Sequence, residues 1–177
     1  MKRILLIGLC VLFSVSVSGI VYGQTAYLGV GASYNLEGID FDQFEDDASG
    51  LNFRFGIKVN ETIALEVNID QTQQFENIDN SQHFDLTSFS FNGKYIFPFS
   101  SSSVQPFITA GVGLLFSKSN AAMAMDETDM GVNFGAGIDL FVTDALALCG
   151  SVKYFRAFGD LEDVNFTQIM VGTVYYF

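Results

Sequence analysis

The chain has 177 residues, the length of one domain, and 49% of them are hydrophobic, which argues against an intrinsically disordered protein. Acidic residues outnumber basic residues by 20 to 8, for a net charge of −12, and this balance argues against a nucleic-acid partner, because phosphate binding needs a basic surface. A mean hydropathy of +0.32 beside so much acid is unusual for a soluble globular protein, so the apolar surface needs an explanation.

The N-terminus has the three-part layout of a secretory signal peptide. Residues 1–3 include two basic residues, residues 4–17 form an apolar run, and residues 18–23 are small or polar with a small residue at the end. A retained membrane anchor is the alternative, but the apolar run is shorter than the roughly 20 residues of a spanning helix. We therefore expect a signal peptide over 1–23 and a mature domain over 24–177.

The two cysteines do not predict a disulfide. Cys10 lies inside the expected signal peptide, and Leu9 before it is too bulky for a lipoprotein processing site. Removal of the signal peptide leaves Cys149 as the remaining cysteine, so no intramolecular disulfide is possible. We expect Cys149 to be a small packing residue.

The rest of the chain alternates between apolar residues and residues that are small, polar or charged. Such alternation predicts β-strands with one apolar face, and each segment has about ten residues, the length that a tilted strand needs to cross a bilayer. The expected fold is therefore an all-β, eight-stranded, antiparallel, up-and-down transmembrane β-barrel. The apolar positions run through 28–34, 51–59, 63–69, 87–97, 108–116, 132–140, 146–154 and 169–177.

The connections between these strands differ in length. Outer-membrane barrels have short periplasmic turns and longer external loops, and an even number of strands puts both termini on the periplasmic side. The expected long loops are 35–49, 71–84, 117–130 and 157–164, and the shorter connections are 60–62, 98–105 and 143–145.

Three segments resemble the OmpA/OmpX-type family of small outer-membrane β-barrels. They are Ala110-Gly111-Val112-Gly113, the stretch 135–139 (Gly-Ala-Gly-Ile-Asp) and the ending 171–177 (Val-Gly-Thr-Val-Tyr-Tyr-Phe). The resemblance implies a location in the cell outer membrane, contact with outer-membrane lipid, and terminal residues Tyr175 and Phe177 that act as a signal for the outer-membrane assembly machinery.

Charged residues also fall on the predicted lumen face. Because an unpaired buried base is costly and the lumen of eight strands is just wide enough for side chains, we expect an ion-pair network with Glu66 at its centre. Aligned strand ends would put Lys94 opposite Glu66. The alternative is that these charges are solvated in a wet lumen. The network residues are Arg54, Lys58, Glu66, Asp70, Lys94, Asp139 and Lys153.

Fourteen of the 20 acidic residues lie in the four expected external loops. Acidic loops often only keep a surface soluble, and divalent-cation binding or contact with a surface partner is the functional alternative. The spacing in 40–47 lacks the pattern of a helix–loop–helix calcium site. The loop acids are Glu37, Asp40, Asp42, Glu45, Asp46, Asp47, Glu76, Asp79, Asp126, Glu127, Asp129, Asp160, Glu162 and Asp163.

Enzymatic activity is not expected. His83 is the only histidine, and its neighbours Ser81 and Asp85 are ordinary loop composition rather than a catalytic triad. We expect no catalytic residues, no cofactor and no metal site of the usual kinds.

The sequence therefore predicts an outer-membrane β-barrel with a structural or surface-interaction role, in adhesion or envelope integrity, through its acidic loops. A narrow pore is one alternative, opposed by large side chains that would fill the lumen. A soluble, lipocalin-like ligand-binding barrel is another, and it would put the apolar face inside. The expected lumen-filling residues are Phe107, Leu115, Phe141 and Phe155.

Overall fold

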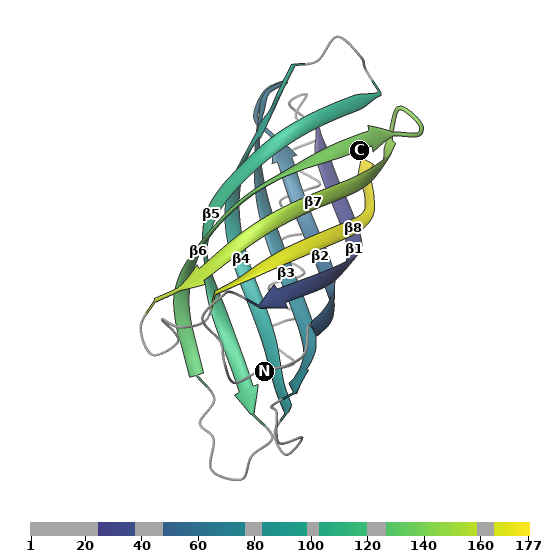
Figure 1. Cartoon of the computed structure of the whole chain (residues 1–177). Helices are drawn as coiled ribbons and strands as arrows, with labels where there is room; N and C mark the ends of the chain where they lie inside the picture. The colour runs from purple at the N-terminus through teal and green to yellow at the C-terminus, as the bar shows by residue number, and fades with distance from the viewer. Residues whose placement is uncertain (1–24, 38–47, 77–82, 99–102, 120–126, 159–164) are drawn as a thin grey trace.

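A computed structural model of the chain describes residues 25–37, 48–76, 83–98, 103–119, 127–158 and 165–177. The described residues form eight strands (Figure 1). Among the described residues, no helix is long and apolar enough to span a membrane. The strands are β1 (Ala26–Glu37), β2 (Ala48–Lys58), β3 (Ile63–Glu76), β4 (His83–Ile96), β5 (Val104–Ser119), β6 (Glu127–Phe141), β7 (Leu146–Ala157) and β8 (Asn165–Tyr176).

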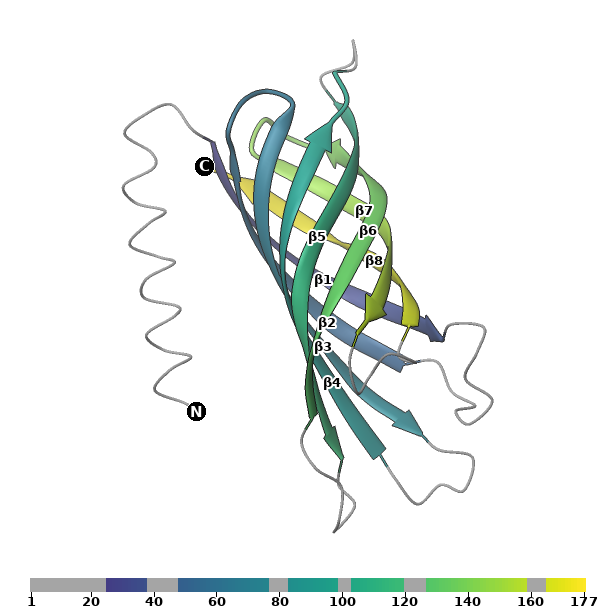
Figure 2. The same cartoon turned by 90° about the vertical axis from the view of Figure 1, so that its left-hand side faces the viewer.

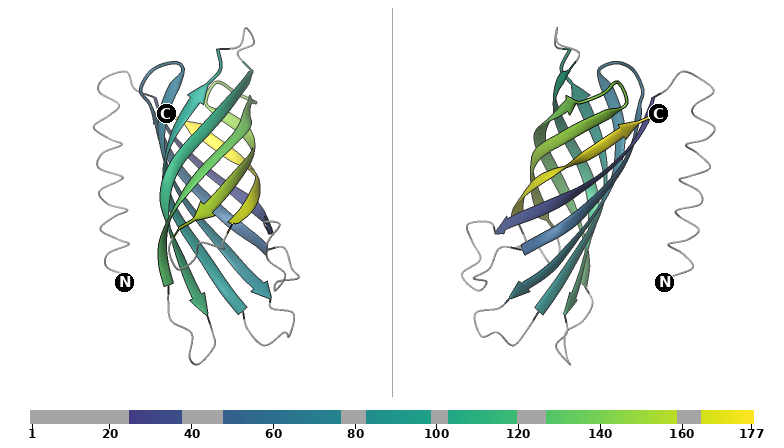
Figure 3. Two further views of the ribbon diagram at one scale, coloured as in Figure 1. Left: turned by 60° about the vertical axis from the view of Figure 1, so that its left-hand side comes forward. Right: turned by 90° about the vertical axis from the view of Figure 1, so that its right-hand side faces the viewer.

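The strands close into one barrel in sequence order, and each strand is antiparallel to the next. The first and last strands complete the closure, with Tyr27 opposite Tyr176 and Glu37 opposite Phe166. Closure leaves no sheet edge, so the backbone of every strand can bond to its neighbours in an apolar solvent. Figure 3 shows the strands tilted around the barrel. The predicted up-and-down barrel is confirmed.

The two ends of the barrel differ. We call the end at which β2 is followed by β3, β4 by β5 and β6 by β7 the turn end, and the opposite end the loop end. The chain closes at the turn end, where the Phe177 amide donates to the Ala26 carbonyl at 2.8 Å. Figure 2 shows the C-terminus beside the start of β1. This puts the start of β1 and the end of β8 on the same side, as the even strand count predicts.

The strands are longer than the expected ten residues. β5 has 16 residues and β6 has 15, and both continue into the loops predicted from the sequence. The ladder extends past the apolar band, for example where Thr72 lies opposite Leu86. Backbone bonding does not need apolar side chains, so the end of the apolar alternation marks the edge of the apolar band and not the end of the strand.

Apolar side chains cover the outside of the barrel, and charged side chains lie within it. Phe134 and Val171 on the outer face are 59% and 67% exposed, whereas Glu66 and Lys94 in the lumen are each 1% exposed. This arrangement is the reverse of a soluble ligand-binding barrel, which excludes the lipocalin-like alternative. An apolar outer face of this kind is typical of transmembrane barrels.

Inward-facing glycines make room for large neighbours in the lumen. Gly56 lies directly opposite Tyr27, and the Tyr27 ring covers the position that a side chain on Gly56 would occupy. Gly29 does the same for Arg54, since a Cβ atom there would lie 2.8 Å from the Arg54 Cδ atom. A glycine in the strand therefore lets a long side chain cross the strand beside it.

Candidate functional site

The lumen is the candidate site, and a cluster of buried apolar side chains lies toward each of its ends. The cluster at the turn end, which we call the turn-end plug, includes Tyr27, Ile96, Phe107, Ala147, Cys149, Val174 and Tyr176, with Phe141 packed against it. The cluster at the loop end, the loop-end plug, consists of Leu86, Leu115, Phe155, Ala157 and Phe166. The four residues predicted to fill the lumen all lie in these plugs. Polar and charged side chains occupy the space between them.

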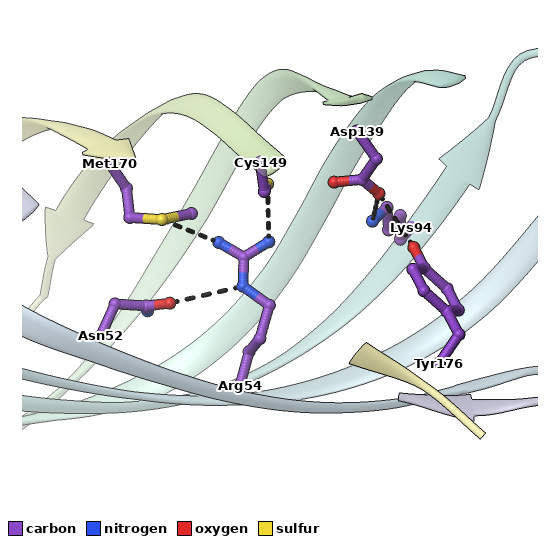
Figure 4. Close-up of polar contacts among 7 residues, drawn as sticks. All are labelled: Asn52, Arg54, Lys94, Asp139, Cys149, Met170 and Tyr176. Carbon is purple, nitrogen blue, oxygen red and sulfur yellow. Dashed lines mark hydrogen bonds and ion pairs between the residues drawn. The ribbon is translucent and has the colours of Figure 1, made fainter. Parts of the chain in front are cut away.

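An ion pair crosses the turn-end plug. The Lys94 ammonium lies 2.8 Å from an Asp139 carboxylate oxygen, and the same oxygen accepts a hydrogen bond from the Tyr176 hydroxyl at 3.1 Å (Figure 4). The Lys94 Nζ atom also lies 3.9 Å from the centre of the Phe107 ring. The ring and the carboxylate both stabilise the buried ammonium, as cation–π and charge-assisted contacts do.

Glu66 does not have the partner that the sequence predicted. Gly56 on β2 lies opposite Glu66, but on β4 it is Asn92 that lies opposite Glu66, and Lys94 lies opposite Ala64, so the predicted alignment of Lys94 with Glu66 is wrong by two residues. Neighbouring strands of a tilted barrel are staggered, so their ends do not align. Lys94 instead reaches Asp139 across β5.

The Glu66 carboxylate remains in a positively charged environment. The side chain is buried, and the cations whose charges act on it are Lys94, Arg54 and Lys153. Its Oε1 atom has no hydrogen-bond partner among the described residues. Glu66 is therefore surrounded by bases at a distance rather than fixed in a close pair.

Arg54 crosses the lumen from β2 to the far wall. Its guanidinium donates to the Cys149 sulfur on β7 and to the Met170 sulfur on β8, at 3.2 Å each (Figure 4). Its Nε atom donates to the Asn52 amide oxygen at 3.4 Å. Cys149 is buried and packed, as predicted, and it is also a hydrogen-bond partner that the sequence did not indicate.

Asp70 is held by neutral donors rather than by a base within ion-pair distance. Its carboxylate accepts hydrogen bonds from Asn52 at 2.6 Å, from Gln168 at 3.1 Å and from Ser88 at 3.3 Å. Gln168 also donates to Asn35 at 3.2 Å. These donors come from β2, β4 and β8, so the carboxylate ties both sides of the chain closure together. These polar residues occupy the non-apolar positions of the strand alternation, and that pattern could have identified them from the sequence.

The two remaining basic residues of the predicted network, Lys153 and Lys58, differ in how deeply they are buried. Lys153 is 3% exposed, and its Nζ atom has no hydrogen-bond partner among the described residues. Lys58 is only half-buried at the turn end, where its ammonium lies 4.8 Å from the centre of the Tyr176 ring. The structure therefore brings six of the seven predicted residues into the lumen and leaves Lys58 at its rim.

Several predictions concern residues outside the described part of the chain. These are the signal peptide, most of the loop acids, Ser81, and the side chains of His83 and Asp85. Within the described residues, no group of three or more histidine, cysteine, aspartate or glutamate side chains is arranged to hold a metal ion.

Comparison with known proteins gives a family and a set of similar folds. The family model described as "outer membrane protein beta-barrel domain" matches residues 7–177. No sequence among the curated proteins matches significantly.

Three solved structures show the similarity of fold. The attachment invasion locus protein Ail of Yersinia pestis is 18% identical, with 87% of this chain and 99% of that chain covered and a TM-score of 0.64. Neisserial surface protein A is 18% identical, with 88% and 97% covered and a TM-score of 0.65. The N-terminal barrel of Pseudomonas aeruginosa OprF is 16% identical, with 87% and 97% covered and a TM-score of 0.62.

Proposed function

The chain belongs to the family of outer membrane protein β-barrel domains and is located in the outer membrane, and from this premise we propose a structural and surface-interaction role, in adhesion or envelope integrity, without enzymatic activity. The observation that carries the proposal is the filling of the lumen by buried side chains. A barrel whose interior is filled offers its outer face to lipid and its loops to the surroundings, so its interactions occur outside the lumen.

The filling of the lumen supports this role. Rings from Tyr27, Phe107 and Tyr176 surround the Lys94–Asp139 pair at the turn end. At the loop end the Phe155 and Phe166 rings are stacked, with their centres 4.8 Å apart. An eight-stranded barrel has little width to spare around such side chains.

The charge of the loops indicates the kind of surface partner. Most of the loop acids have no base near them in sequence, and Lys118 and Arg156 lie only at the loop edges. The Ail structure is a complex with a heparin analogue, sucrose octasulfate. A polyanion of that kind would be repelled by the acidic loops of this chain, so we propose divalent cations or a basic surface as the partner.

The end of β8 supports a role in assembly. Tyr175 and Phe177 are exposed on the outer face, and their rings form an edge-to-face pair with centres 5.2 Å apart. We propose that this pair is the signal for the outer-membrane assembly machinery.

A narrow pore is the second candidate. It is favoured by buried polar atoms without hydrogen-bond partners among the described residues, such as Lys153 Nζ and Glu66 Oε1, which lie between the two plugs. Planar-bilayer recording distinguishes the two roles. We expect small or absent conductance, and steady open channels would favour the pore.

The surface role is tested by neutralising the loop charge. In one variant the acids Asp40, Asp42, Glu45, Asp46 and Asp47 become amides, and in the control Glu61 and Asp144, which are exposed at the turn end, become amides. We expect the loop variant to lose Ca²⁺ binding by calorimetry and to make cells sensitive to EDTA with detergent, while the control matches the parent. Parental behaviour in both variants contradicts the proposal.

A further inference from the structure

Two turns at the turn end, the one between β2 and β3 and the one between β6 and β7, have the same pattern of hydrogen bonds. They lie on opposite sides of the barrel. In each turn a valine N–H donates to the carbonyl of the residue four positions later at 2.8 Å, and the next N–H donates to the same carbonyl at 3.2 Å. In each turn a polar side chain also accepts from the backbone N–H groups that follow it. The first turn uses Val59, Asn60 and Ile63, and the second uses Val142, Thr143 and Leu146.

Each of these turns also accepts a hydrogen bond from the end of a neighbouring strand, and the two bonds are equivalent. The Ile96 amide donates to the Thr62 carbonyl at 2.7 Å, and the Tyr176 amide donates to the Ala145 carbonyl at 2.7 Å. These bonds join the end of β4 to the first turn and the end of β8 to the second. Since β4 and β8 are four strands apart in an eight-stranded barrel, they lie on opposite sides of it.

The hydrogen bonds at the two places where one half of the barrel meets the other are equivalent as well. A seam here is the pair of strands where one half of the barrel meets the other, either β4 with β5 or β8 with β1. The Phe97 amide donates to the Pro106 carbonyl at 2.9 Å, and the Phe177 amide donates to the Ala26 carbonyl at 2.8 Å. Each half therefore ends by bonding to the first residues of the other half.

The sequences of β4 and β8 follow this correspondence at a spacing of 80 residues. Thr87 corresponds to Thr167, and the ring pair Tyr95–Phe97 corresponds to Tyr175–Phe177. Both ring pairs are edge-to-face with centres 5.2 Å apart, at interplanar angles of 89° and 81°. Both occupy the outer face at the turn end, where aromatic side chains anchor a barrel at the membrane interface.

We propose that the barrel consists of two equivalent four-stranded units, 25–97 and 103–177, and that the β4–β5 seam is a second closing seam, at which the chain can begin and end as it does at the β8–β1 seam. The interaction surfaces are the edge strands of each unit, so that β4 pairs with β5 and β8 pairs with β1. The proposal concerns how the barrel closes and is independent of the surface role.

The lumen explains why each unit selects the other rather than a copy of itself. The contacts of Lys94 with Asp139, and of Arg54 with Cys149 and Met170, all join the first unit to the second. Equivalent residues of the two capped turns, such as Val59 and Val142, are 83 residues apart. At this spacing Gly56 on β2 of the first unit corresponds to Asp139 on β6 of the second. Two copies of the first unit would therefore leave Lys94 without its carboxylate.

Circular permutation tests the proposal in cells. The permutant keeps residues 1–24 at its start, continues with 103–177, a short Gly/Ser linker and 25–97, and so ends at Phe97. A control permutant is opened between Asn60 and Glu61, which cuts the capped turn and leaves no aromatic pair at the chain end. Both keep all eight strands, and the readout is the heat-dependent mobility of protein extracted from the outer membrane.

We expect the permutant ending at Phe97 to reach a folded fraction within about twofold of the parent and the control to fall at least about fivefold below it. Efficient folding of both permutants, or failure of the first alone, overturns the proposal.

A pair of substitutions keeps the test valid if both permutants fold poorly. In the parent chain, the proposal predicts that Phe97→Ala and Phe177→Ala lower the urea midpoint by equal amounts, since the two rings occupy equivalent seams. Phe134→Ala is the matched control, because Phe134 is an exposed outer-face aromatic on β6 away from both seams. Unequal effects of Phe97→Ala and Phe177→Ala, with one of them equal to the control, contradict the equivalence.

Discussion

The Lys94 ammonium lies 2.8 Å from the Asp139 carboxylate, although β5 separates the strands that carry the two residues. The pair therefore bridges non-adjacent strands across the interior. Because the Tyr176 hydroxyl also donates to Asp139, the last strand of the chain is attached to the same carboxylate. This contact fixes the positions of β4, β6 and β8 relative to one another at the turn end.

Removing one partner of this pair should destabilise the barrel. We expect Asp139→Ala to cost about 3–5 kcal/mol of unfolding free energy, because it leaves the buried Lys94 charge unpaired. The measurement is urea unfolding in lipid vesicles. Asp144→Ala, which removes an exposed charge at the turn end, should cost about 0–1 kcal/mol. Equal midpoints for the two variants would show that the lumen solvates Lys94 without Asp139.

Glu66 and Lys153 should be coupled in the same assay. Glu66→Gln removes a buried negative charge that Arg54, Lys94 and Lys153 surround, so we expect a lower urea midpoint than for Glu61→Gln, which alters an exposed turn residue. Adding Lys153→Met should recover part of the loss, because the Lys153 ammonium has no hydrogen-bond partner of its own among the described residues. Strictly additive effects would indicate that the two groups do not interact.

Two glycines on opposite faces should respond differently to the same substitution. Gly56→Ala places a methyl group in the space of the Tyr27 ring, and we expect a cost of about 1–3 kcal/mol from overpacking. Gly150→Ala is the matched control, because nothing lies within 4 Å of the position of its added methyl group. A stable Gly56→Ala barrel would mean that Tyr27 can leave the lumen without loss.

The processed protein should start at or near Gln24 and should remain folded in cold SDS, changing mobility only after boiling. The first expectation follows from the signal-peptide pattern of the N-terminus, and the second from closure, which leaves no strand edge for detergent to attack. N-terminal sequencing of the outer-membrane protein and gel mobility before and after heating measure them. An intact Met1 contradicts the first, and identical mobility contradicts the second.

The sequence by itself determined the strands and their faces. Arg54, Glu66 and Lys94 each alternate with apolar residues, and the two-residue period of a strand requires neighbours along the chain to point to opposite sides. This relationship is local, so alternation was sufficient to put these charges on the face opposite the apolar residues, and the structure of the barrel decided that the charged face is the lumen. The alternation stops at the edge of the apolar band, which is why β5 and β6 were predicted too short.

Only the tertiary structure decided which lumen residues meet. Lys94 pairs with Asp139 because the stagger between tilted strands shifts each neighbour along the barrel axis, and the shifts accumulate around the barrel. Arg54 reaches Cys149 and Met170 because closure brings β8 beside β1 and leaves only β1 between Arg54 and Met170. These contacts depend on register and closure over long sequence distances, and no local pattern in the chain specifies either of them.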